Sequence, residues 1–141
     1  MSSIRFDPES GRPLPVPNPT TRPFFDAARE HRLVLPRCPR DGFFFYPRSR
    51  CPRCWRDDWE WQAASGRGEV HAFTVDRVGH DPALGPLAPF AIAVVELEEG
   101  PRMTAAVVDC DVDDLRVGMP LEVCFLDVDG DALVQFRPRS A

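Results

Sequence analysis

Five short apolar runs follow Gly66, and they restrict the fold of this chain more than any other feature of its sequence. Each run is rich in valine, alanine, leucine or phenylalanine and is followed or preceded by a segment of turn-forming residues. The runs are EVHAFTV (69–75), FAIAVVEL (90–97), RMTAAVVD (102–109), LEVCFLDV (121–128) and ALVQF (132–136). Most of the segments between them are too short for a helix, so the sequence predicts a small β barrel or sandwich.

Alternation along two of the runs favours the barrel. In the last run Ala132, Val134 and Phe136 fall on one face of a strand, and the residues between them fall on the other. The run 90–97 interleaves large and small side chains, as the tapered interior of a small barrel requires. We therefore predict a mainly β protein whose residues 63–141 form a five-stranded Greek-key OB-fold barrel.

The N-terminal part of the chain has a different composition, with more proline and no alternating apolar runs. Residues 1–20 include the proline-dense segment SGRPLPVPNP, which favours an extended, polyproline-like arm. A short helix is predicted from Pro23 to about His31, because proline suits a first helical position and the following apolar residues can share one side. Residues 21–62 are predicted to combine this helix with a rubredoxin-like, zinc-ribbon knuckle.

The knuckle is indicated by two turns with the same C-P-R-x frame. Cys38-Pro39-Arg40-Asp41 and Cys51-Pro52-Arg53-Cys54 are separated as in a zinc ribbon, where two tight turns each present two ligands to one tetrahedral ion. The predicted ligands are Cys38, Asp41, Cys51 and Cys54, and the predicted cofactor is zinc.

Asp41 leaves an alternative open. A carboxylate oxygen can ligate zinc, but sites rich in thiolate bind it better, so a ribbon without metal is also compatible with the sequence. In that case the aromatic residues 43–46, with the tryptophans that follow, provide the packing and the three cysteines are small buried groups. These aromatics are predicted to form mainly the core between knuckle and barrel.

Composition disfavours several kinds of partner. The formal net charge is −5, and all 17 basic residues are arginine. A chain without a cluster of lysines lacks the usual electrostatic surface for phosphate backbones, so nucleic acid is a disfavoured partner. No apolar run is long enough for a membrane span and the first residues do not form a secretory signal, which predicts a cytoplasmic protein that does not bind membranes.

Taken in order, these segments resemble a known family. They are PFFDAA, LVLPRC, FFFYPRSRCPRC, WEWQAASGRGEVHAFTV, VVELEEGPRM, RVGMPLEV and VQFRP. The resemblance, from about Thr20 to Pro138, is to bacterial and archaeal zinc-ribbon plus OB-fold proteins that were long labelled a domain of unknown function and are encoded beside thiolases and other acyl-CoA enzymes. It implies the partner subunit of a thiolase-like enzyme or a MaoC-type enoyl-CoA hydratase in a hetero-oligomer. The partner reaction would be condensation, acyl transfer or retro-aldol cleavage, including the cleavage of steroid side chains.

The sequence itself contains no recognisable nucleophile and base arrangement, which favours an accessory subunit without catalytic activity of its own. A CoA ester carries phosphates that arginine can bind, so a few arginines could position it. The candidate residues for substrate or partner contacts are Arg67, Arg77, His80 and Arg102, and the loop 76–89 is the candidate surface. A single-strand nucleic-acid-binding OB module is the alternative function.

Overall fold

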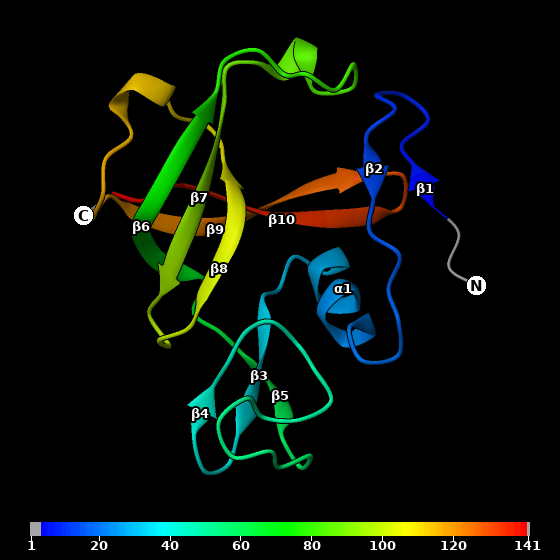
Figure 1. Cartoon of the computed structure of the whole chain (residues 1–141), viewed down its shortest axis with the longest axis vertical. Coiled ribbons are helices and arrows are strands. Elements are labelled where there is room, and N and C mark those ends of the chain that lie inside the picture. Colours follow the sequence, from blue (N-terminus) through cyan, green and yellow to red (C-terminus); the bar gives the residue numbers. More distant parts are fainter. Residues whose placement is uncertain (1–3, 141) are drawn as a thin grey trace.

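A computed structural model describes residues 4–140 of this chain, and a closed barrel forms its larger part (Figure 1). The barrel confirms the predicted mainly β, OB-fold architecture. Its five strands coincide with the five apolar runs to within three residues at each end. They are β6 (Arg67–Asp76), β7 (Phe90–Leu97), β8 (Arg102–Val107), β9 (Pro120–Val128) and β10 (Asp131–Pro138).

The order of the strands in the barrel is β10-β8-β7-β6-β9. Strands β6, β7 and β8 are antiparallel neighbours, β10 then pairs in parallel with β8, and β9 closes the barrel against the start of β6. This is the Greek-key order of an OB fold. Two short 3-10 helices, η1 (Gly85–Leu87) and η2 (Val112–Asp114), interrupt the long connections.

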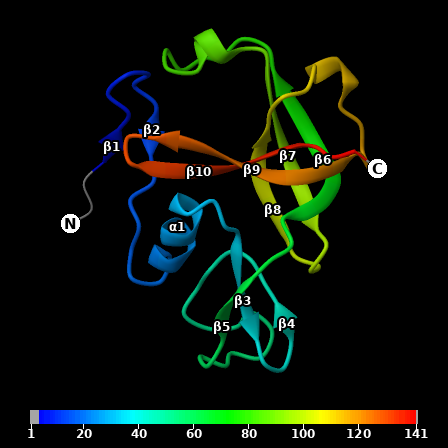
Figure 2. The ribbon, with the colours of Figure 1, turned by 180° about the vertical axis from the view of Figure 1, so that it is seen from behind.

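The hairpin between β9 and β10 follows from its sequence. Asp129 and Gly130 form a two-residue loop in which both residues have a positive φ, of 48° and 80°. That conformation matches the twist of the two strands, and Asp-Gly is a preferred pair for it. The hairpin projects beyond the barrel toward the N-terminal arm, as two opposite views show (Figures 1 and 2).

The interior of the barrel is filled by alternating residues of its strands, including the fully buried Val70, Val95, Leu121 and Phe136. The same apolar cluster extends to Phe24 of the helix and to Leu35 of the knuckle. Barrel, helix and knuckle therefore share one core.

The knuckle lies at one end of the barrel and is built on a three-stranded sheet (Figure 1). The sheet contains β3 (Val34–Cys38), β4 (Gly42–Phe43) and β5 (Glu60–Ala63), in the order β4-β3-β5. The preceding helix α1 (Arg22–Arg29) begins one residue before the predicted start and ends two residues before the predicted end. Its buried residues are Phe24, Ala27 and Ala28, whereas Phe25, which we expected on the apolar side, is only partly buried.

The arm contains more regular structure than its composition indicates. Strands β1 (Arg5–Phe6) and β2 (Pro13–Leu14) form a small hairpin, and Leu14 is buried. The Arg5 guanidinium forms an ion pair with Asp131 at the start of β10. Residues 1–3 of the predicted arm lie outside the described residues. Among the described residues, no helix has the length and apolar character needed to cross a membrane.

Candidate functional site

The four predicted metal ligands come together in the knuckle. Cys38 ends β3, Asp41 lies in the turn before β4, and the second C-x-x-C turn brings Cys51 and Cys54 against them. The Sγ atoms of Cys38 and Cys54 are 3.6 Å apart, and Oδ2 of Asp41 lies 3.5 Å from Sγ of Cys51. One ligand atom from each of the four residues lies within 4.8 Å of the others.

These spacings fit a tetrahedral ion. With Zn–S bonds of about 2.3 Å and a Zn–O bond of about 2.0 Å, a regular tetrahedron has S···S edges of about 3.8 Å and S···O edges of about 3.5 Å. The observed S···S distance is 3.6 Å, and the S···O distances from Asp41 are 3.5 Å to Cys51 and 3.9 Å to Cys38. Asp41 therefore occupies the place that a fourth cysteine would take.

The ionisation of the cluster also depends on Asp41. A hydrogen bond from the Cys54 thiol is the main cause that lowers the pKa of Asp41, and the same contact raises the pKa of Cys54 to about 12. For Cys38, burial raises the pKa, but hydrogen bonds from the backbone N–H groups of Asp41 and Arg40 and from neighbouring thiols outweigh burial and lower it. A divalent cation among these groups would displace the Cys54 proton and neutralise the charge that the cluster concentrates.

Two aromatic side chains cover part of the cluster. Cys38 and Cys51 are almost fully buried, and Phe44 and Trp59 pack against them with their rings 5.5 Å apart. Four protein ligands in a buried, closed cluster are typical of a structural metal site, since a catalytic site keeps one position open for water or substrate.

The aromatics of the knuckle divide between core and surface. Phe43, Phe45 and Trp61 pack against the shared core, as predicted. Tyr46 and Trp55 are 50% and 70% exposed. The hydroxyl of Tyr46 accepts a hydrogen bond from the backbone N–H of Thr104 and so joins the knuckle to β8.

The four predicted contact residues do not form one cluster. Arg67 and Arg102 lie at the starts of β6 and β8, where they pair with Glu98 and Glu96. Arg77 and His80 lie in the loop after the far end of β6, and Arg77 pairs with Asp113 at 3.0 Å. Each arginine already has a carboxylate partner, so binding a CoA phosphate would require an exchange of partners. Their role stays a prediction.

A large apolar groove was not apparent in the sequence. Two adjoining cavities, of about 430 and 640 Å³, share the lining residues Arg12, Thr104, Ala106 and Gln135, and we call the two together the apolar groove. Its floor is the outer surface of β8 and β10. One end is lined by Phe25, Phe45 and Tyr46, and the other by Leu84, Leu87 and Leu126. The predicted contact loop 76–89 thus supplies part of one wall.

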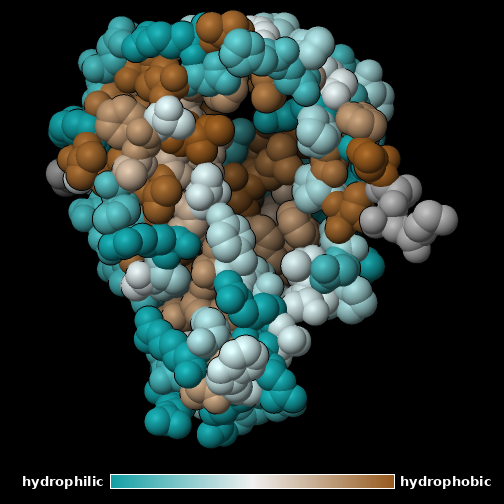
Figure 3. All heavy atoms as spheres, in the orientation of Figure 1, coloured by the Kyte–Doolittle hydropathy of each residue, from teal (hydrophilic) through white to brown (hydrophobic). Residues whose placement is uncertain are grey.

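The groove is visible in the space-filling view as a hollow with an apolar floor (Figure 3). In the ribbon it corresponds to the region between the barrel on one side and α1 with the arm on the other, below the loop that carries η1 (Figure 1).

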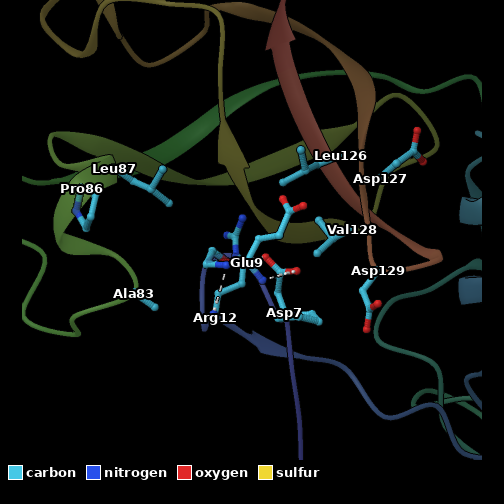
Figure 4. Close-up of a pocket in the computed structure, with 12 residues that line it drawn as sticks. Asp7, Glu9, Arg12, Ala83, Pro86, Leu87, Leu126, Asp127, Val128 and Asp129 are labelled. Carbon is cyan, nitrogen blue, oxygen red and sulfur yellow. Dashed lines mark hydrogen bonds between the residues drawn. The ribbon is translucent and has the colours of Figure 1, made fainter.

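A third, more polar cavity of about 790 Å³ adjoins the groove and shares Arg12, Leu87 and Leu126 with it (Figure 4). Four acidic residues line it: Asp7, Glu9, Asp127 and Asp129. Asp127 accepts a hydrogen bond from Nε2 of His31 if that nitrogen carries the proton, at 2.8 Å, and Asp129 lies 3.8 Å from Arg5. Two of the four carboxylates thus have a basic neighbour.

The fold and the cluster define a class of protein in which a closed, ribbon-type metal knuckle is joined to an OB barrel. The profile of the ChsH2 rubredoxin-like zinc ribbon domain matches residues 25–60, and that of the ChsH2 C-terminal OB-fold domain matches residues 61–126. A DUF35 domain-containing scaffold protein of Methanothermobacter thermautotrophicus is 35% identical over 111 residues, which cover 77% of this chain and 83% of that protein. The chain belongs to this DUF35 family of zinc-ribbon and OB-fold proteins.

Two further similarities extend this result. A probable enoyl-CoA hydratase alpha subunit of Thermomonospora curvata is 34% identical over 133 residues, which are 93% of this chain but only 41% of that relative. This chain thus spans less than half the length of that protein. The solved structure of an Ltp2-ChsH2(DUF35) aldolase contains a chain that is 33% identical, with a TM-score of 0.79, and the match covers 89% of this chain and 98% of that one.

Proposed function

We propose that this chain is an accessory subunit of an acyl-CoA enzyme, without a catalytic site of its own. The observation that carries the proposal is the similarity to a chain of the Ltp2-ChsH2(DUF35) aldolase, which covers 89% of this chain and 98% of that one. The relative from Thermomonospora curvata is called a hydratase subunit, so a MaoC-type hydratase is a second candidate partner beside the thiolase-like enzyme expected from the sequence.

In this function the knuckle is a structural element. Cys38, Asp41, Cys51 and Cys54 would hold a zinc ion that fixes the two turns relative to each other and to β3. The ion would supply no chemistry to a substrate, because all four positions around it are taken by the protein. The residues of this chain that face a substrate are then those of the barrel, its loops and α1.

Affinity capture tests the proposal. The tagged chain, expressed in its source organism at native level, should recover a thiolase-like enzyme or an enoyl-CoA hydratase in a fixed ratio, and excess untagged chain should displace the tagged one. Turnover of the recovered enzyme should fall when this chain is removed and return when it is added back. Recovery of no acyl-CoA enzyme, together with unchanged turnover of both candidate enzymes after deletion of the chain, contradicts the proposal.

Elemental analysis tests the metal. Protein purified without chelator should contain one zinc per chain after dialysis, and Cys51→Ala should lose it. Cys110→Ala, which removes a cysteine outside the cluster, should retain it. Absence of zinc from the unmodified protein would favour the alternative ribbon without metal.

A further inference from the structure

The metal cluster contains three of the five cysteines of the chain, and these three differ in their access to solvent. Cys38 and Cys51 are buried, at 0% and 1% exposed, whereas Cys54 is only partly buried. With zinc bound, all three are thiolates, because the metal displaces the thiol protons. Cys54 is therefore the thiolate through which a small oxidant in solution can reach the cluster.

Cys38 lies in position to complete an oxidation that begins at Cys54. Their Sγ atoms are 3.6 Å apart, although the two residues belong to different turns and are 16 residues apart in the sequence. A disulfide has its sulfur atoms at about 2.05 Å, so the two atoms need to approach by about 1.5 Å. A thiolate this close to an oxidised cysteine acts as a resolving cysteine.

The charge around the cluster favours reaction with a peroxide. Arg53 directly precedes Cys54 and Arg40 directly precedes Asp41, and both arginines are exposed. The guanidinium of Arg53 also donates a hydrogen bond to the backbone carbonyl of Asp41, at 3.4 Å. Reactive cysteines are typically partly exposed and close to basic groups. Positive charge at this place stabilises the anion that leaves when a peroxide O–O bond breaks.

The two cysteines outside the cluster are less reactive. Burial raises the pKa of the Cys110 thiol and of the Cys124 thiol, so both stay protonated at neutral pH. The thiolate is the nucleophile, and a protonated thiol reacts slowly. Oxidation of the zinc-loaded chain should therefore begin in the knuckle.

Asp41 limits this oxidation to one disulfide. A carboxylate is not oxidised, so a disulfide between Cys38 and Cys54 leaves Asp41 and Cys51 as the remaining ligands. Two protein ligands are half of the set that a structural zinc site requires, and such a pair does not retain the ion. A ribbon with four cysteines would instead form two disulfides.

We infer that the knuckle is a peroxide-sensitive switch, in which oxidation of Cys54 and Cys38 to a disulfide releases the metal. The Cys54 thiolate attacks one oxygen of hydrogen peroxide and becomes a sulfenic acid, while the other oxygen leaves as hydroxide. The Cys38 thiolate then attacks the Cys54 sulfur, the S–S bond forms and a second hydroxide leaves. The two sulfur atoms lose two electrons in all, and one peroxide is reduced. The inference rests on the proposed zinc site and adds its regulation.

Treatment of the zinc-loaded full chain with hydrogen peroxide tests the inference, with released zinc measured by the chromogenic chelator 4-(2-pyridylazo)resorcinol. The chain should release its zinc within the time in which the same peroxide oxidises an equal concentration of glutathione. Its mass should then be about 2 Da below that of the reduced, metal-free chain, because one disulfide removes two hydrogen atoms. Peptide mapping should join Cys38 to Cys54, and dimedone present during the reaction should label Cys54.

Three variants provide the comparison. Cys110→Ala and Cys124→Ala should release zinc at the rate of the unmodified chain, because neither residue belongs to the cluster. Asp41→Cys should also release zinc, but its mass should fall by about 4 Da, since the four cluster thiols then pair as two disulfides. Dithiothreitol and added zinc should restore the metal content of the unmodified chain.

Four results overturn the inference: zinc retained while glutathione is oxidised, a disulfide that joins Cys51 to Cys54, dimedone on a buried cluster cysteine instead of Cys54, or metal binding that dithiothreitol does not restore. Each of these leaves the proposed zinc site intact, because the untreated chain still contains the metal. Absence of zinc from the untreated chain overturns the zinc site and the switch together. Affinity capture of the acyl-CoA enzyme by the reduced chain depends on neither result.

Discussion

Replacement of Asp41 by cysteine should change the number of protons that zinc binding releases. The Asp41 carboxyl is ionised well below neutral pH, because the Cys54 thiol donates a hydrogen bond to it and lowers its pKa. It therefore has no proton to lose when a metal arrives. A cysteine with a pKa of about 8.5 or higher is almost fully protonated at pH 7 and must lose that proton to bind zinc as thiolate.

The expected magnitude is about one additional proton for Asp41→Cys at pH 7, and a dependence of log affinity on pH that is steeper by about one unit. The unmodified chain should itself release at least one proton, since the pKa of Cys54 is about 12 and this thiol is protonated before zinc binds. The expected difference does not require the stripped knuckle to stay folded. An unfolded aspartate is also ionised at pH 7, and an unfolded cysteine is also protonated.

Calorimetric titration of the chelator-stripped chain with zinc, in two buffers of different ionisation enthalpy, measures this proton count. Asp57→Cys is the matched control, because Asp57 lies in the same knuckle, is exposed, and is not part of the cluster. Its proton count should equal that of the unmodified chain. An equal count for Asp41→Cys would refute the assignment of Asp41 as a ligand at the fourth position.

Three further predictions concern the barrel and its loop. Gly68→Ala should destabilise the fold by about 1–3 kcal/mol in urea denaturation, because its Cβ would lie 2.6 Å from a backbone carbonyl oxygen of β7. Gly85→Ala is the control: the nearest contact of its Cβ is at 3.4 Å, so it should change the stability by no more than about 0.5 kcal/mol. Equal effects of the two substitutions would contradict the steric argument. Phe136→Ala should cost about 3–5 kcal/mol because Phe136 is fully buried in the core, and the exposed Arg137→Ala should cost far less in the same measurement. The carboxylate of Asp76 accepts hydrogen bonds from the backbone N–H groups of Gly79 and Val78, and these lower its pKa. The stabilisation from these bonds is therefore present above the usual pKa of 3.8 and is lost as pH falls through the lowered pKa. The protection of the loop amides, measured against the intrinsic exchange rate at each pH, should fall over that range of acid pH, and an equal fall in Asp76→Asn would contradict the role of the carboxylate.

The sequence predicted the strands well because each depends on local pattern. A run such as FAIAVVEL can bury one face only when it is extended, and the glycine and proline residues around it prevent a helix from forming across its ends. The helix was predicted to within two residues for a similar reason, since Pro23 sets its start and the apolar residues set its buried side. The cluster of Cys38, Asp41, Cys51 and Cys54 could also be predicted from the sequence, because each turn has the spacing of a ligand pair.

The hairpin and position of the arm, and the groove, were not predicted, because their contacts join residues far apart in the sequence. The arm is held near the β9–β10 hairpin by Arg5 and Asp131, which are 126 residues apart. Local sequence gives no sign that Leu87, Ile92 and Leu126 line a cavity outside the barrel. From their apolar character alone, these residues would be expected in the core. Arg12 lies within a proline-rich segment, and such a segment is equally compatible with a solvent-exposed arm.

The sequence by itself determined the β-rich barrel, the short helix and the two knuckle turns, because periodicity, turn residues and ligand spacing act within a few residues of one another. The tertiary structure decided the closure of the barrel through β8, β9 and β10, the place of the arm, and the groove between them. It also placed Arg12 among the residues that line both cavities of that groove. These features depend on which distant surfaces meet, and that depends on the packing of one shared core.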